Sequence, residues 1–281
     1  MAGKGVIYST GQLDCLSYYS KIFSKIKDFV NDREIATKTY IPESPIPFIV
    51  HRGSDDPVLR ISDLLGINQS FLKLRFHHKL HDVEKTLNEK QKLIWRYFVP
   101  RKLVELHYAC NHEGINKGFD RVFIDIDASK GTTEAEYIKV VKQLLKEIKS
   151  DKELKKLSSY KIYLLWTGRS MHVYLMLSKK LPHSAYEKYF AFHKDTLTTK
   201  WANNITAKTK VNVRAGHERK KGAIILDTSA TPSGKLARLP YSLHLNHNGE
   251  LTGVAVPLKE KDLKPGLFKL GKLTPDKALK Y

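Results

Sequence analysis

RVFIDIDASK, residues Arg121–Lys130, is an apolar run that carries two carboxylates near its end. The segment from Val122 to Ile126 is typical of a buried β-strand. Asp125 and Asp127 are two positions apart, so in a strand their side chains point to the same face. Two neighbouring anions repel each other unless one is protonated or a cation lies between them, and a hard divalent metal ion with oxygen ligands is the usual solution. The stretch therefore predicts a metal site.

The charge balance indicates a polyanionic partner. The 281 residues include 49 Lys+Arg and 29 Asp+Glu, which gives a formal net charge of +20. That excess is far more than solubility requires. The basic residues are spread through the chain, and no apolar run is long enough to span a membrane. We therefore expect nucleic acid, and no membrane, as the partner. A lysine-rich surface of the thermophile type is the alternative, although glutamate would then balance the lysine.

Two features of the chain indicate an intracellular protein. Cys15 and Cys110 are the only cysteines, too few for a disulfide framework or a zinc site built of cysteines alone. The first ten residues, MAGKGVIYST, lack the apolar core of a signal peptide. We expect a soluble, cytoplasmic protein.

A loose group of histidines near Cys110 raises the question of zinc. Their spacing matches no pattern with both ligand pairs. We interpret the group as surface histidines beside a buried thiol, with a structural zinc ion as the open alternative. The histidines are His77, His78, His81, His107 and His112.

Hydrophobic periodicity predicts helices and strands on both sides of the acidic strand. Apolar residues at three- and four-residue spacing predict helices, and short β-branched runs predict strands. Asn248-Gly249 between alternating apolar residues predicts a hairpin. The expected helices are Leu13–Val30, Leu80–Phe98, Thr132 or Thr133 to Ile148, and Leu181–Trp201. The expected strands are Glu34–Ile41, Pro47–His51, Lys161–Trp166, His172–Leu177 and Ala223–Leu226.

WTGRSMHVYL, residues 166–175, predicts a hairpin that carries phosphate-binding side chains. Its short link delivers Arg169, Ser170 and His172 to one end of the sheet. Hydroxyl, imidazole and guanidinium groups all donate hydrogen bonds to phosphate oxygens. A nucleophilic Ser–His pair is a competing interpretation, but no acid is placed to orient the histidine. A hairpin whose polar residues only face water is the other alternative.

A basic stretch, Lys208 to Lys221, follows the last expected helix and is interpreted as a mobile loop. Around Gly216 and Gly222 it could track a nucleic-acid backbone, or it could be an ordinary solvated turn. We favour a nucleic-acid contact because the whole chain is basic. Its basic residues are Lys208, Lys210, Arg214, Arg219, Lys220 and Lys221.

A third acid, Asp227, ends the short apolar strand that starts at Ala223. The construction repeats that of Ile124-Asp125. If this strand end lies beside the first pair of acids, three carboxylates could hold two divalent ions. Alternatively, Asp227 caps the turn TSATPSG that follows it.

Three segments in fixed order resemble the archaeo-eukaryotic primase superfamily. They are Asp125-Ile126-Asp127, then Gly168 to His172, and then Asp227 followed by Arg238 to His244. The last segment, RLPYSLH, is most similar to the catalytic small subunit of archaeal and eukaryotic DNA primase. The resemblance implies an α/β (α+β) primase-polymerase core with a mixed, largely antiparallel sheet flanked by helices. It implies a catalytic domain over 1–260, with an N-terminal region over 1–118 and a motif-bearing core over 119–258. Beyond Leu258 the chain is rich in lysine and contains two prolines, which predicts a basic, surface-lying tail over 259–281.

The resemblance also implies roles for the motif residues. Asp125, Asp127 and Asp227 would bind two Mg²⁺ or Mn²⁺ ions, and Ser170 and His172 would hold the triphosphate of an incoming nucleotide. Assistance would come from Arg169, Arg238 and His244. The implied partners are a DNA template and primer, NTPs and dNTPs, and a primase large subunit or an end-joining protein.

Two departures leave the reaction open between three functions. The chain lacks the cysteine-rich zinc knuckle that is common in the primase small subunit. PYSLH followed by VAVPL is also similar to the polymerase domain of end-joining ligases. We therefore expect a DNA primase or primase-polymerase, with a gap-filling polymerase and a non-catalytic nucleic-acid-binding module as alternatives.

Overall fold

The computed structural model describes residues 13–41, 44, 46–51, 57–270 and 272–281. The chain forms two compact units. Unit 1 comprises Met1–Ala109, Leu236–Val254 and Thr274–Tyr281, and unit 2 comprises Cys110–Lys235 and Ala255–Leu273. Each unit is built from segments that are distant in the sequence, so each is described by itself.

Unit 2 is built on a mixed sheet with the strand order β12-β5-β6-β4-β8-β7. Its strand pairs are antiparallel except for the parallel pair β7 and β8. The expected mixed, largely antiparallel sheet is therefore confirmed. The strands are β4 (Phe119–Asp127), β5 (Tyr160–Trp166), β6 (Met171–Leu181), β7 (Val213–Ala215), β8 (Ile224–Asp227) and β12 (Val256–Leu258).

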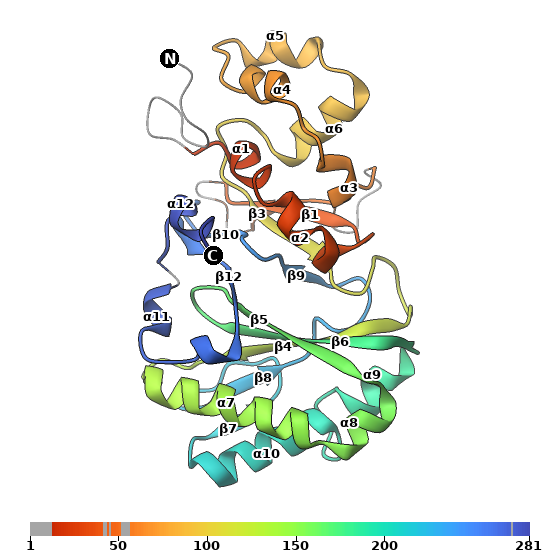
Figure 1. The fold of residues 1–281 in the computed structure, drawn as a ribbon, viewed down its shortest axis with the longest axis vertical. Helices are drawn as coiled ribbons and strands as arrows, with labels where there is room; N and C mark the ends of the chain where they lie inside the picture. The colour runs from red at the N-terminus through yellow and green to blue at the C-terminus, as the bar shows by residue number, and fades with distance from the viewer. Residues whose placement is uncertain (1–12, 42–43, 45, 52–56, 271) are drawn as a thin grey trace. The chain divides into compact units, whose positions relative to one another are not determined.

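Helices cover one face of this sheet. Helix α7 (Glu134–Ser150) begins where the Thr133 hydroxyl accepts the backbone N–H of Glu136 and the Glu136 carboxylate accepts the backbone N–H of Thr133. It packs against α10 (Leu197–Thr209) on the same side of the sheet (Figure 1). The remaining helices of unit 2 are α8 (Lys152–Leu157), α9 (Ser184–Tyr189), η1 (Glu260–Asp262) and α11 (Leu267–Leu270).

Unit 1 combines a sheet, a hairpin and short helices. The sheet order is β2-β1-β3-β9, and β10 pairs with β11 in the hairpin expected at Asn248-Gly249. Its strands are β1 (Ile35–Thr39), β2 (Phe48–Val50), β3 (Glu105–Ala109), β9 (Leu236–Arg238), β10 (Leu243–Leu245) and β11 (Leu251–Val254). Its helices are α1 (Cys15–Tyr19), α2 (Phe23–Val30), α3 (Ile61–Leu64), α4 (Gln69–Leu74), α5 (Leu80–Lys85), α6 (Glu89–Tyr97) and α12 (Pro275–Ala278).

Three of the expected helices are each divided in two. The expected helix Leu13–Val30 is α1 and α2, Leu80–Phe98 is α5 and α6, and Leu181–Trp201 is α9 and the start of α10. Asn88 caps α6 through a capping box with Gln91, and Thr196 caps α10. A polar cap inside an apolar periodicity starts a new helix because its side chain binds the first free N–H groups.

Two further expectations need correction. The basic stretch is not one loop, because Lys208 lies in α10, Lys210 caps that helix and Arg214 lies in β7. Strand β7 forms the edge of the sheet within this stretch, and the loop is confined to residues 216–222. The segment 259–281 does not lie wholly on the surface either, since its residues Leu263 and Leu267 are buried in the core of unit 2.

Among the residues that the structure describes, the histidines are not part of any group of three or more His, Cys, Asp or Glu side chains that could hold a metal ion. His77, His78 and His81 are exposed and Cys110 is buried, as expected, but His107 and His112 are only partly exposed, so the interpretation as surface histidines is wrong for these two. Within the ranges that the structure describes, no helix is both long and apolar enough to cross a membrane.

Candidate active site

Strand β4 separates an apolar face from an acidic one. Val122, Ile124 and Ile126 belong to the core cluster that includes the inner face of α7. Asp125 and Asp127 alternate with them and therefore point to the opposite face of the sheet. The alternation predicted from RVFIDIDASK places both acids together, as expected.

Asp227 lies directly across from Asp125. Strands β4 and β8 are antiparallel neighbours, with Asp125 paired to Asp227 and Asp127 paired to Ile225. Directly opposed side chains in such a pair share a face, with Cβ atoms about 4.5–5.5 Å apart. The sheet therefore brings all three acids to one face, with Asp125 at the centre of the group.

Burial and the neighbouring acids raise the affinity of Asp125 for a proton. Burial and the neighbouring charges of Asp127 and Asp227 raise its pKa to about 7, against the opposing effects of a Ser170 hydrogen bond and of Arg219. A cation in this position would lower that pKa again. The raised pKa of Asp125 therefore indicates that a cation would bind favourably at this site.

The other two acids have partners. Asp127 Oδ1 accepts a hydrogen bond from Arg219 Nη2 at 2.7 Å. Asp227 Oδ1 accepts the backbone N–H of Ser229 at 2.7 Å, so it caps the turn after β8. Both interpretations of Asp227 hold at once, since this residue caps the turn and also opposes Asp125.

The hairpin between β5 and β6 holds its polar residues beside the acids. The Thr167 hydroxyl accepts the backbone N–H groups of Arg169 and Ser170, and Gly168 has a φ of 94°, which suits glycine in so tight a link. His172 is the partner of Asp125 in the sheet register, and its Nε2 lies 3.7 Å from Asp125 Oδ1. Ser170 and His172 are therefore grouped with the acids.

A tyrosine from α7 links strand β4 to strand β6. The Tyr137 hydroxyl donates to the carbonyl of Ile126 at 2.6 Å and accepts the N–H of Met171 at 2.7 Å. Ile126 lies between the acids of β4, and Met171 lies between Ser170 and His172. Helix α7 thus fixes the spacing of the two motifs from the opposite side of the sheet.

The acidic face has the donor set of a magnesium or manganese site. Asp125 Oδ1 is buried and accepts no hydrogen bond from the described residues. Carboxylate oxygens are the ligands that Mg²⁺ and Mn²⁺ prefer. In the described structure the three acids do not converge into a preformed ligand set, and Arg219 binds the carboxylate of Asp127. The residues fit a divalent ion, and their role as ligands stays a prediction.

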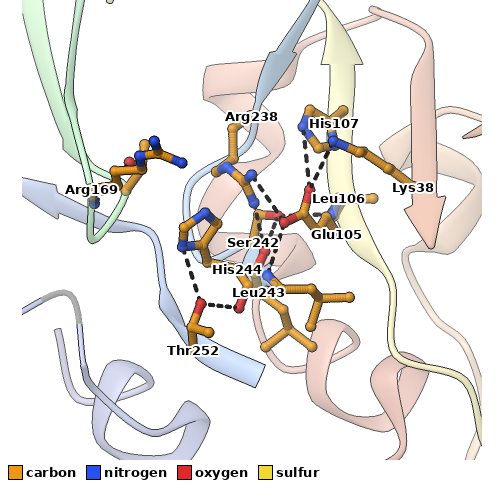
Figure 2. A network of polar contacts seen from close by, with 12 residues as sticks. Lys38, Glu105, Leu106, His107, Arg169, Arg238, Ser242, Leu243, His244 and Thr252 are labelled. Carbon is orange, nitrogen blue, oxygen red and sulfur yellow. Dashed lines mark hydrogen bonds and ion pairs between the residues drawn. The ribbon is translucent and has the colours of Figure 1, made fainter. Parts of the chain in front are cut away.

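Arg238 and His244 belong to unit 1 and have their own network there (Figure 2). Arg238 Nη1 donates to the carbonyl of Leu243 at 2.7 Å, and its Nη2 lies 3.1 Å from Oε1 of the fully buried Glu105. His244 is held by Thr252, whose hydroxyl donates to the His244 carbonyl at 2.9 Å and lies 3.3 Å from its Nδ1.

Glu105 is the residue that the sequence does not reveal. It lies in the apolar strand ELHYA, where a lone acid is easily taken for an exposed one. Burial raises the pKa of Glu105, but the nearby charge of Arg238 and the other polar contacts of this carboxylate together outweigh burial and lower the pKa below its usual value. Burial, together with Arg238, lowers the pKa of the neighbouring His107 to about 3, so His107 is neutral at neutral pH.

The six basic residues after α9 are not gathered into one surface. Lys208 Nζ donates to Glu147 Oε1 on α7 at 2.7 Å. Arg219 pairs with Asp127, whereas Lys220 and Lys221 are exposed in the loop 216–222. Arg219 thus links this loop directly to the acidic face.

This arrangement of sheet and helices is the fold of a polymerase domain. In particular, the structure is similar to the polymerase domain from Mycobacterium tuberculosis Ligase D in complex with DNA, with a TM-score of 0.63 and 16% sequence identity. The match covers 100% of this chain and 92% of that chain. No protein-family model matches the chain, and no curated protein matches it. At this identity the likeness establishes the fold.

Proposed function

We propose that the protein is a DNA-directed nucleotidyltransferase of the primase-polymerase type. One observation carries the proposal: Asp125, Asp127 and Asp227 share one face of two adjacent strands. The phosphate-binding candidate His172 lies on the neighbouring strand β6, and Ser170 directly precedes that strand. Carboxylates that can hold two cations, next to donors that can hold a triphosphate, suit the transfer of a nucleotide to a 3′-hydroxyl.

Each group has a defined task in this reaction. The three acids would hold the Mg²⁺ or Mn²⁺ ions, which supply Lewis acidity to the attacking hydroxyl and to the leaving pyrophosphate. Ser170 and His172 would donate hydrogen bonds to the triphosphate and so orient the α-phosphate for in-line attack. Arg169, Arg238 and His244 would add positive charge and further donors.

DNA is the proposed template and primer. The net charge of +20 suits a phosphate backbone, and the similar solved structure is that of a polymerase domain in complex with DNA. The same likeness favours extension of a primer or filling of a gap. The order of the motifs favours a primase, which starts chains without a primer.

The test is an incorporation assay with three substrates. The purified protein is incubated with Mg²⁺ or Mn²⁺, labelled NTPs or dNTPs, and a bare template, a primed template or a gapped duplex. Products on the bare template would identify a primase, and products only on the primed or gapped DNA would identify an extending polymerase. Absence of incorporation on every substrate would leave a non-catalytic DNA-binding module and refute the proposal.

Arg219→Ala should tighten the binding of Mn²⁺ in the absence of DNA. Arg219 forms an ion pair with the carboxylate of Asp127, and the Arg219 side chain is 52% exposed, so the ion pair is weak. Breaking such a pair should improve the apparent Kd for Mn²⁺ about threefold to fivefold. Electron paramagnetic resonance of free Mn²⁺ measures the change. Lys220→Ala, which removes one charge from the same loop, is the control, and equal effects of the two variants would contradict a specific competition for Asp127.

A further inference from the structure

Glu105 is a buried acid whose two oxygens lie at different distances from basic side chains. Its side chain is fully buried, and its Oε1 lies 3.1 Å from Arg238 Nη2. Lys38 Nζ and His107 Nε2 lie 3.9 and 4.0 Å away from Oε2, beyond hydrogen-bond distance. Arg238 is therefore the principal partner of this carboxylate.

The contacts of Glu105 reach both sides of His244. Oε1 also accepts the backbone N–H of Leu245 at 2.9 Å, while Arg238 donates to the carbonyl of Leu243. Leu243 and Leu245 are the two neighbours of His244 in β10. Glu105 thus connects the guanidinium of Arg238 with the strand that carries His244 (Figure 2).

A contribution to stability does not by itself explain the buried ion pair of Glu105 and Arg238. A buried ion pair costs much desolvation, and apolar residues of similar volume often stabilise a core as well. A guanidinium has a planar, directional set of donors, so a fixed carboxylate determines which way its remaining donors point. Arg238 retains a small accessible surface, 12% of its side chain, through which a ligand could reach it.

We infer that Glu105 is a positioning residue, which orients Arg238 and the strand around His244 for binding the phosphates of the incoming nucleotide. The inference rests on the proposed function, because that function gives Arg238 its ligand. Glu105 itself touches no substrate. It acts by fixing two residues that do, and the predicted defect is therefore in nucleotide affinity rather than in chemistry.

The test compares Glu105→Gln with a matched buried acid. Glu105→Gln keeps an oxygen for the N–H of Leu245 but removes the charge that faces Arg238. Asp14→Asn is the control, since Asp14 is an equally buried acid of unit 1 that binds Arg75 at 2.8 Å. Glu105→Gln should raise the KM for nucleotide about tenfold with kcat within about twofold, and Asp14→Asn should change neither by more than about twofold.

A double mutant separates positioning from general destabilisation. Arg238→Ala alone should raise the KM for nucleotide at least as much as Glu105→Gln. If Glu105 acts through Arg238, the double mutant should show no further increase, because the two changes remove one interaction. Independent, multiplicative effects would overturn the inference, as would a Glu105→Gln enzyme with an unchanged KM.

A second readout does not require activity. The Nε–H signal of Arg238 in a nitrogen-15 NMR spectrum, identified by its loss in Arg238→Ala, should shift when dGTP and Mg²⁺ are added. In Glu105→Gln the free signal should broaden, and the response to dGTP should be lost. If the wild-type protein incorporates no nucleotide, the proposed function fails while this titration still decides the inference. A wild-type signal that does not respond to dGTP, or an unaltered response in Glu105→Gln, would overturn it.

Discussion

Asp125→Asn should lower the rate of nucleotide incorporation at least about a thousandfold, because Asp125 is a proposed metal ligand and loss of a metal ligand removes several kcal/mol of transition-state stabilisation. Asp125 is the central acid of the site, with Asp227 opposite and Asp127 two positions away. An amide of the same shape supplies one neutral oxygen and cannot offset the charge of a divalent ion. Single-turnover extension of a labelled primer measures the loss.

The affinity for DNA should remain within about threefold of the wild-type value. Binding of DNA depends mainly on positive charge that meets the phosphate backbone, and Asp125 contributes none. Fluorescence anisotropy at fixed salt provides this measurement. Asp120→Asn, on the same strand, is the control for activity. Near-normal extension by Asp125→Asn, or an equal loss in Asp120→Asn, would contradict the role of Asp125.

The metal-free protein should lose stability as the pH rises from about 4 to about 7. The folded-state pKa of Asp125 is raised from 3.8 to about 7, so the folded state binds this proton more tightly than the unfolded state does. The contribution is fully present below the unfolded pKa and is lost as the pH passes through the folded pKa. Over this window the free energy of unfolding should fall by at most about 4 kcal/mol. Solvent contact of the Asp125 side chain, which is 24% exposed, reduces the effect further.

The difference between wild type and Asp125→Asn isolates this residue. Other buried acids, such as Asp14 and Glu105, have lowered pKa values and gain stability as the pH rises. Denaturant unfolding in EDTA at several pH values between about 4 and about 7.5 should show the wild type losing stability relative to Asp125→Asn. At the upper end the variant should be the more stable protein, since it lacks the repulsion among the acids. A difference that does not vary with pH would contradict the raised pKa.

The acidic strand illustrates what local sequence can predict. Asp125 and Asp127 share a face because strand periodicity is a local property, and the apolar alternation around them is visible in RVFIDIDASK. The cap of Asp227 on its turn is local as well. These features, and the hairpin that carries Ser170 and His172, follow from residues that are close in the chain.

The contact between Asp125 and Asp227 depends on the order of the strands in the sheet, which local sequence does not determine. Strand β8 lies on one side of β4 and β6 on the other, and no local pattern specifies which neighbour a strand takes. The same holds for Glu105, whose partner Arg238 lies on another strand far along the chain. The pairing of Arg219 with Asp127 is also non-local, so the basic loop could be predicted but not its contact.

The divided helices have a different cause. The capping box of Asn88 and Gln91 can be recognised in the sequence, but the apolar periodicity continues across it. The spacing of apolar residues indicates which face of a helix is buried, whereas capping residues indicate where a helix begins and ends. The expected helices were based on the apolar spacing alone.

The central claim is that nucleotide transfer depends on the three acids together. The most direct measurement is the addition of one templated nucleotide to a labelled primer with Mn²⁺, by the wild-type protein and by Asp227→Asn side by side. We expect a product one nucleotide longer with the wild type and none with Asp227→Asn, at equal affinity for DNA. No product with the wild type, or equal product with both, would contradict the claim.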